Sequence, residues 1–273
     1  MHTSRKQIAQ LITTSLQQNR SELEQQYSET EHEIGYFVLD DLFPQDFAQK
    51  IYECFPSVEK TVQRKSIREH KYVGYQMNEF EALLEEVIYA FQEPEVVRLI
   101  GEICQIEAIE ADEHLYAGGI SLMKQDHFLN PHLDNSHDKD RNKWRVLNLL
   151  YYVTPDWELK DGGNLELWPH GVQSKPVTVA SKFNRLVVMS THQKSWHSVS
   201  KVEVDKVRCC VSNYYFSEQP LLPSDSFHVT TFRGRPEERL KKVMLRIDGF
   251  LRGSLRKLFK KGVVKNKHVY KKD

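Results

Sequence analysis

The sequence predicts an all-β core with flanking helices (α+β): a double-stranded β-helix, or jelly roll, with N-terminal helices and a basic C-terminal helix. Three observations predict it. Alternating or fully apolar runs separated by turn residues fill positions 115–216, enough for about seven or eight strands. Apolar residues recur at helical spacing before that region, and again after it among many Lys and Arg. So many short strands suit a closed or double-sheet antiparallel architecture.

We expect three regions along the 273 residues. Residues 1–110 form a helical region that packs on the core, with its first strand at 35–40. Residues 111–226 form the jelly-roll core, and residues 227–273 form a basic helical extension. A hydrophobic content of 40% and a charged content of 28% are ordinary for a globular protein.

The sequence also contains features that predict where in the cell the protein is located. No run approaches the roughly 18 apolar residues of a membrane span, and the first 20 residues are too polar for a secretory signal. The four cysteines, Cys54, Cys104, Cys209 and Cys210, show no Cys-x-x-Cys spacing, which favours reduced thiols. We therefore expect a cytoplasmic protein, with peripheral association with the membrane left open.

The N-terminal elements follow from apolar spacing and from turn residues. Helices are expected at 7–27, 45–55, 79–92 and 94–104, and a short buried strand at 36–39. The stretch 57–75 is basic and polar with no clear period. We interpret it as a mobile or substrate-facing segment.

Residues 130–134, Asn-Pro-His-Leu-Asp, lie just before a buried-strand pattern at 146–153. Side chains at i and i+2 of an extended segment share a face, so His132 and Asp134 project together. His197 follows another strand-like run at 185–189 and supplies a third ligand. Two histidines and one carboxylate leave three positions of a metal open, as in non-haem Fe(II) oxygenases.

Such a site needs a co-substrate that makes the metal reactive, and a 2-oxo acid can chelate it through its keto oxygen and nearer carboxylate. The far carboxylate then requires a buried cation, because an unpaired buried charge costs several kcal/mol. Arg208 opens the strand pattern at 208–216 and fits this role. Lys206 is the rival cation, but a guanidinium binds a carboxylate through two parallel hydrogen bonds.

These motifs together resemble the catalytic domain of prolyl 4-hydroxylase-type Fe(II)/2-oxoglutarate-dependent dioxygenases. The resemblance is carried by His132-Leu-Asp134, Leu149-Leu-Tyr-Tyr152, Asp156-Trp157, Gly162-Gly163, Leu165, Trp168-Pro169, Phe183-Asn-Arg-Leu186, His197 and Arg208. Residues 35–44 also resemble the start of this domain. Together these segments cover roughly two thirds of the chain.

The resemblance implies roles for individual residues. Fe(II) would be held by His132, Asp134 and His197. Arg208 would pair with the distal carboxylate of 2-oxoglutarate, and Tyr152 would donate its hydroxyl to the same group. The co-substrate pocket would also be lined by Leu165 and Ser212.

Our first hypothesis is an enzyme that uses O2 and 2-oxoglutarate to hydroxylate an unactivated C–H bond, releasing succinate and CO2. Asp134 argues against a halogenase, because the halogenases of this family lack the carboxylate. Two alternatives stay open: a non-catalytic jelly-roll module tethered to an anionic surface by its tail, and a cupin-like metal hydrolase or isomerase. The substrate is left open among a peptidyl proline, a small metabolite and a glycan- or lipid-linked sugar.

The C-terminal extension is strongly basic. Residues 227–273 hold 15 Lys and Arg against 4 Asp and Glu, so the preceding residues are acidic by the same surplus. Within it, 236–261 carry apolar residues at helical spacing. This helix either packs on the acidic body of its own domain or contacts an anionic membrane surface or anionic glycan. Nucleic acid is disfavoured, since no nucleic-acid-binding motif accompanies the charge.

Overall fold

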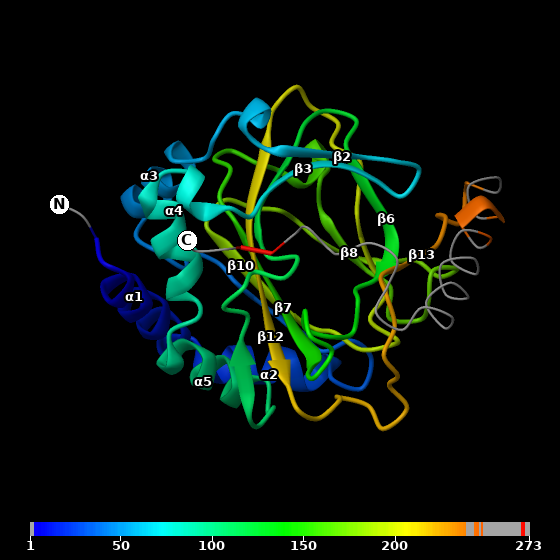
Figure 1. The fold of residues 1–273 in the computed structure, drawn as a ribbon, viewed down its shortest axis with the longest axis horizontal. Coiled ribbons are helices and arrows are strands. Elements are labelled where there is room, and N and C mark those ends of the chain that lie inside the picture. Colours follow the sequence, from blue (N-terminus) through cyan, green and yellow to red (C-terminus); the bar gives the residue numbers. More distant parts are fainter. Residues whose placement is uncertain (1–2, 239–242, 246, 248–268, 271–273) are drawn as a thin grey trace.

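The computed structural model describes residues 3–238, 243–245, 247 and 269–270. Within them, helices on one side cover a strongly curled sheet (Figure 1). The α-helices are α1 (Arg5–Gln18), α2 (Arg20–Thr30), α3 (Gln45–Glu53), α4 (Ala82–Ala90) and α5 (Pro94–Ile103). Short 3-10 turns are η1 (Val58–Lys60), η2 (Met77–Glu79) and η3 (Leu159–Asp161).

Thirteen strands in the described part of the chain form one antiparallel sheet. They are β1 (Tyr36–Leu39), β2 (Val62–Lys65), β3 (Glu69–Gly74), β4 (Ile109–Ala111), β5 (Gly119–Met123), β6 (Phe128–Leu133), β7 (Trp144–Tyr152), β8 (Leu165–Leu167), β9 (Val177–Val179), β10 (Arg185–Ser190), β11 (His197–Val199), β12 (Arg208–Ser217) and β13 (Thr231–Phe232). The order is β1-β10-β7-β12-β5-β3-β6-β11-β8-β9, with β2 and β4 added at β3 and β12, and β13 at β6. The predicted jelly-roll fold is confirmed.

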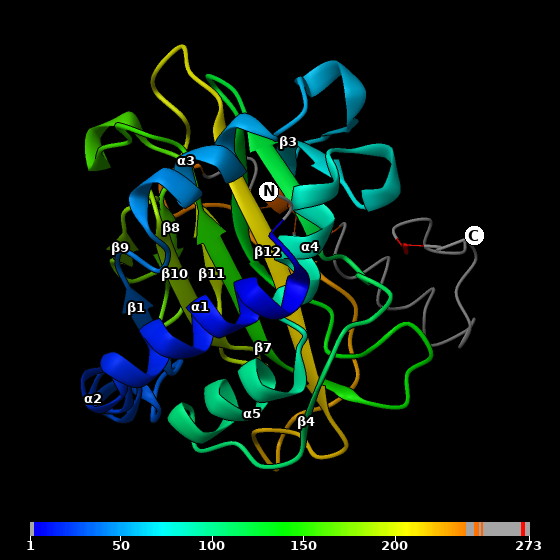
Figure 2. The same ribbon diagram turned by 90° about the vertical axis from the view of Figure 1, so that its left-hand side faces the viewer.

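The helices pack on the outer face of strands β10, β7 and β12 (Figure 2). The apolar stripe of α1, including Ile8, Ile12 and Leu16, is fully buried in this main core. The single helix expected at 7–27 is in fact two helices that meet at Asn19. The Asn19 side chain donates a hydrogen bond to the carbonyl of Ser15, which satisfies an end group of α1 and favours the break.

The basic stretch that showed no period in the sequence, 57–75, forms the β2–β3 hairpin. β3 pairs with β5 at one end and with β6 at the other, so the hairpin is part of the sheet and bridges its two halves. Figure 1 shows it running across the top of the molecule toward β6. Four charged residues of the hairpin, Arg64, Arg68, Glu69 and Lys71, line the same cavity as His132 and His197.

The start of the predicted extension lies against the core. Thr231 and Phe232 of β13 pair with Leu133 and His132 of β6. Arg235 binds Glu166 on β8 at 2.6 Å. Most of the helix predicted at 236–261 lies outside the described residues. No helix within the described ranges combines the length and apolar character needed to cross a bilayer.

Candidate metal centre and co-substrate cavity

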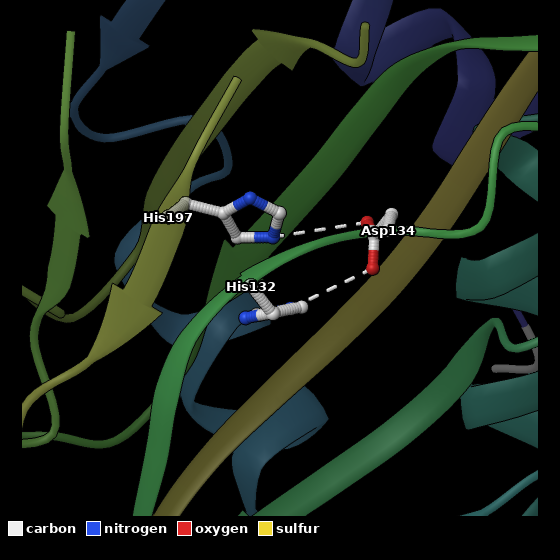
Figure 3. Close-up of side chains that lie close together, drawn as sticks. All are labelled: His132, Asp134 and His197. Carbon is white, nitrogen blue, oxygen red and sulfur yellow. Dashed lines mark ion pairs between the residues drawn. The ribbon is translucent and has the colours of Figure 1, made fainter. Parts of the chain in front are cut away.

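Three side chains predicted as metal ligands converge at one point. His132 is the last residue but one of β6, and Asp134 follows directly after that strand. His197 is the first residue of β11 and pairs with His132. The Nε2 atoms of His132 and His197 lie 3.6 Å and 3.7 Å from the two carboxylate oxygens of Asp134 (Figure 3). One ligand atom from each of the three residues lies within 4.8 Å of the others. This spacing suits one small metal ion.

Both imidazoles are held in the same orientation by their own backbone. Nδ1 of His132 lies 3.0 Å from the carbonyl of Asn130, and Nδ1 of His197 lies 3.0 Å from the carbonyl of Ser195. A carbonyl only accepts, so these contacts assign the proton to Nδ1 and leave the Nε2 lone pair directed at Asp134. Each ligand is therefore fixed by the residue two positions before it.

Asp134 is held ionised by its surroundings. Burial alone would raise its pKa, but His132, His197 and Arg145 together outweigh burial and hold the pKa well below its usual range. Nη1 of Arg145 lies 3.8 Å from Oδ2 of Asp134, and the Asn148 amide donates to the same oxygen at 3.4 Å. The carboxylate therefore stays available as a ligand at any pH near neutrality.

His197 is held neutral. Burial and then the neighbouring His132 lower the pKa of His197 to about 4, although Asp134 acts in the opposite direction. A neutral imidazole is the form that binds a metal. The site therefore combines one ionised carboxylate with a deprotonated Nε2, a donor set that fits Fe(II).

A cavity of about 370 Å³ opens beside this cluster. Its wall includes all three candidate ligands and, on β12, Arg208 and Ser212. Leu165 on β8 also lines it. One cavity is therefore lined by both the metal cluster and the arginine predicted to receive 2-oxoglutarate.

Arg208 is buried, with 2% of its surface exposed. Its Nε donates to Oγ of Ser181 at 3.2 Å, and its guanidinium lies 5.0 Å from the ring of Tyr152. Nη1 is buried and has no hydrogen-bond partner among the described residues. A buried guanidinium nitrogen without a partner is costly, so it fits an anionic ligand that supplies one.

Two other side chains considered for this end of the cavity, Tyr152 and Lys206, do not line it. Tyr152 is fully buried beside Arg208 and is not among the residues that line the cavity. Burial raises the pKa of Tyr152 to about 12, against the influence of Arg208 and Ser181, and its hydroxyl makes no hydrogen bond of normal geometry with described groups. The rival cation Lys206 lies at the surface, near the carbonyl of Asp156, and does not line the cavity.

Several cavity residues were missed from the sequence. Arg145 is 2% exposed and stacks its guanidinium 3.8 Å from the ring centre of Tyr214. Arg145 directly precedes the apolar pattern at 146–153, and a charged residue next to a buried strand was the signal that could have identified it. Phe232 stacks on the ring of His132 at 5.2 Å. No local pattern marks that contact, because it depends on pairing between residues far apart in the chain.

Residues 118–216 match the model of the 2OG-Fe(II) oxygenase superfamily. Among solved structures, a Pseudomonas putida prolyl-4-hydroxylase is similar with a TM-score of 0.53 and 16% identity, over 71% of this chain and 98% of that one. A Trichoplax adhaerens prolyl hydroxylase, solved with a hypoxia inducible factor peptide, gives 0.51 and 17%, over 77% and 96%. A Phytophthora capsici prolyl 4-hydroxylase gives 0.52 and 19%, over 88% and 80%. No curated protein sequence matches this chain significantly.

The solved structures show the fold, and the family match indicates the type of reaction. The matched range contains the three candidate ligands and Arg208. This region is a 2OG-Fe(II) oxygenase domain with a prolyl 4-hydroxylase-like fold. The protein is a dioxygenase whose cofactor is Fe(II) and whose co-substrates are 2-oxoglutarate and O2.

Proposed function

We propose that the protein hydroxylates an unactivated C–H bond with Fe(II) held by His132, Asp134 and His197. The observation that carries this proposal is the meeting of two different features in one cavity. One is a cluster of two imidazoles and a carboxylate within 4.8 Å, and the other is a buried arginine with a nitrogen that lacks a partner. A metal hydrolase would need the first feature and would have no use for the second.

The metal ligands and Arg208 have separate roles in the proposed reaction. Fe(II), when bound, supplies open coordination positions at which O2 reacts, so that one oxygen atom enters the substrate and the other enters succinate. His132, Asp134 and His197 hold the metal through atoms already directed at one point. Arg208 fixes the distal carboxylate of 2-oxoglutarate and thereby sets the distance of its other end from the metal.

Supporting residues complete the proposed co-substrate pocket. Leu165 and Ser212 contact the co-substrate from the wall they line. Tyr152 lies beside Arg208, and its hydroxyl donates to the distal carboxylate once that group is bound. Ser181 accepts from Nε of Arg208, and Nη1 of the same guanidinium is left to bind the ligand.

The substrate and the partners belong to this proposal as well. The substrate is a small molecule, a peptidyl proline or a glycan- or lipid-linked sugar. The basic segment 236–261 contacts an anionic membrane surface or an anionic glycan. That contact rests on the charge and apolar spacing of the sequence.

The metal assignment is tested by anaerobic Fe(II) titration of the purified protein, followed by calorimetry. We expect one Fe(II) per chain in the wild type, and an affinity lower by about a hundredfold or more in His197→Ala, since even outer-shell changes cost 10–100-fold. His170→Ala is the matched control, because His170 is exposed and lies outside the cavity. Normal Fe(II) affinity in His197→Ala would contradict the assignment.

A further inference from the structure

Asn148 is a buried polar residue at the metal end of the cavity. It lies on β7, pairs with Tyr214 of β12, and lines the cavity with 3% of its surface exposed. Its neighbours Leu147 and Leu149 belong to the main core on the opposite face of the strand, as strand alternation requires. The side chain of Asn148 is therefore part of the wall beside the metal cluster.

The amide nitrogen of Asn148 is already bound. Nδ2 lies 3.4 Å from Oδ2 of Asp134, and Nη1 of Arg145 lies 3.8 Å from the same oxygen. An ionised carboxylate only accepts hydrogen bonds, so this contact assigns the nitrogen of the amide to the side of Asp134 and its oxygen to the other side. The orientation of the amide is therefore fixed by a metal ligand.

The amide oxygen of Asn148 is buried and has no hydrogen-bond partner among the described residues. A buried acceptor without a donor is costly, so a donor is expected when the site is filled. Sites that hydrogen-bond a substrate O–H or N–H reject analogues without it, because their buried polar group is then left unpaired. Oδ1 of Asn148 is such a group, and it lies next to the metal ligand Asp134.

The co-substrates cannot supply this donor. At neutral pH 2-oxoglutarate is a dianion, and its carboxylate and keto oxygens only accept hydrogen bonds. O2 carries no hydrogen, and the products succinate and CO2 do not donate at this pH. The donor is therefore expected to come from the substrate.

We propose that the substrate presents an O–H or N–H group to Oδ1 of Asn148, close to the carbon that is hydroxylated. This inference rests on the proposed function, because it requires the reaction to take place at the metal bound by Asp134. Sugars, polyols and secondary amides carry such a group. The ring of a peptidyl proline does not, since its nitrogen has no hydrogen. A cavity of about 370 Å³ is of the size that holds small molecules.

The test compares two pairs of small cyclic probes in which a methyl group replaces the donor hydrogen. The pairs are cyclopentanol with cyclopentyl methyl ether, and 2-pyrrolidinone with N-methyl-2-pyrrolidinone. Ligand-observed NMR titrations measure their dissociation constants for the anaerobic complex of the full chain with Fe(II) and saturating 2-oxoglutarate. In at least one pair, we expect the donor to bind about tenfold more tightly than its methylated partner. The pair that shows this preference distinguishes a hydroxyl from an N–H group.

The variants assign the preference to Asn148. Asn148→Leu removes the acceptor at similar volume and should make the two members of each pair bind equally. A preference caused by the size of the methyl group would persist in this variant. The readout is the ratio within one variant, so a change at Asp134 that weakens both probes does not affect it.

Asn135→Ala is the matched control. Asn135 lines the same cavity, but its amide already donates to the carbonyl of His137 at 2.8 Å, so the preference for the donor should remain. Thermal unfolding checks that each variant is folded. Asn148→Ala takes the place of Asn148→Leu if the latter does not fold, and the wild-type comparison decides if neither folds.

The outcomes separate this inference from the function on which it rests. Wild-type protein that binds Fe(II) and 2-oxoglutarate, but binds neither donor probe or binds both members of each pair equally, overturns the inference alone. An unchanged preference in Asn148→Leu also overturns it. Wild-type protein that binds no 2-oxoglutarate contradicts the proposed function first, and the inference fails with it.

Discussion

The two ends of the cavity differ in how far the protein neutralises its own charges. At the metal end, the Asp134 carboxylate is surrounded by two imidazoles and by Arg145. At the other end, the buried Arg208 has one hydrogen bond from Nε and a buried Nη1 without a partner in the described part of the chain. The metal end is complete as a charged cluster, whereas the Arg208 end needs its anionic ligand. Changes at each end should therefore have separate effects.

The largest effect is expected from Asp134→Ala. The substitution removes a metal ligand and also leaves Arg145 buried beside the vacated position. Removing one partner of a buried ion pair costs about 3–5 kcal/mol. We expect loss of Fe(II) binding together with a lower free energy of unfolding in the metal-free protein, measured by calorimetry and denaturant titration. An unchanged free energy of unfolding in the metal-free protein would show that Asp134 does not stabilise the buried charge of Arg145.

Arg208→Ala should affect the co-substrate alone. Truncating one partner of a buried charge pair costs about 2–5 kcal/mol, so the concentration of 2-oxoglutarate needed for half saturation should rise at least about thirtyfold. Fe(II) affinity should stay normal, because Arg208 contacts none of the three ligands. Lys206→Ala is the control. If Lys206→Ala weakens 2-oxoglutarate binding and Arg208→Ala does not, the wrong cation has been assigned.

Gly163→Ala should also weaken 2-oxoglutarate binding, but by less than Arg208→Ala does. A Cβ at Gly163 would lie 2.8 Å from Cδ of Arg208, and its φ of +63° belongs to the left-handed region. Displacement of the arginine should weaken 2-oxoglutarate binding by up to about tenfold, equivalent to about 1.4 kcal/mol. Gly171→Ala has a similar φ of +80° with nothing near its Cβ, and so controls for backbone strain. Equal affinities in the two variants would argue against the contact.

Asp112→Asn tests the buried carboxyl group of Asp112, which is influenced by Arg145 near the metal cluster. Burial raises the pKa of Asp112 from 3.8 to about 7, although Arg145 acts to lower it. Because the folded-state pKa is raised, the stabilising contribution is complete below about pH 4 and is lost as the pH rises to about 7. Asp112→Asn should therefore reduce the loss of unfolding free energy between about pH 4 and about pH 7. Denaturant titrations at several pH values would measure this loss. Asp140→Asn, at an exposed site, should keep the wild-type slope.

A separate prediction concerns the basic tail. Attraction to an anionic leaflet is worth about 1 kcal/mol per basic residue and weakens with salt. We expect sedimentation with anionic liposomes at low salt, reduced when Arg256, Lys257, Lys260 and Lys261 are all replaced by Gln. Substitution is preferred to truncation at Thr231, because Phe232 and Arg235 contact the core. Equal sedimentation of both proteins would contradict the membrane contact.

Much of the fold and of the candidate site was predictable from local patterns. Strand periodicity and turn residues gave the jelly roll, and the i, i+2 spacing brought His132 and Asp134 together. The order of the strand patterns also led to His197, which the structure pairs with His132. These predictions succeeded because each depends on residues close in sequence or on the usual order of strands.

The remaining wall of the cavity was not predictable, because it depends on pairing between distant segments. The β2–β3 hairpin has too few apolar residues to show a period, and its place follows from pairing with β5 and β6. Phe232 reaches His132 through a two-residue strand about 100 positions away. Arg145 was overlooked because it stands just before the apolar pattern at 146–153, and its partner Asp134 was considered only as a ligand.

The most direct test is a crystal structure of the protein grown without O2 in the presence of Fe(II) and 2-oxoglutarate. We predict one metal ion bound by Nε2 of His132, Nε2 of His197 and the carboxylate of Asp134, with the distal carboxylate of 2-oxoglutarate on Arg208. A metal bound elsewhere, or a co-substrate carboxylate on Arg64 or Arg68 with Arg208 left unbound, would contradict the assignment of the two ends.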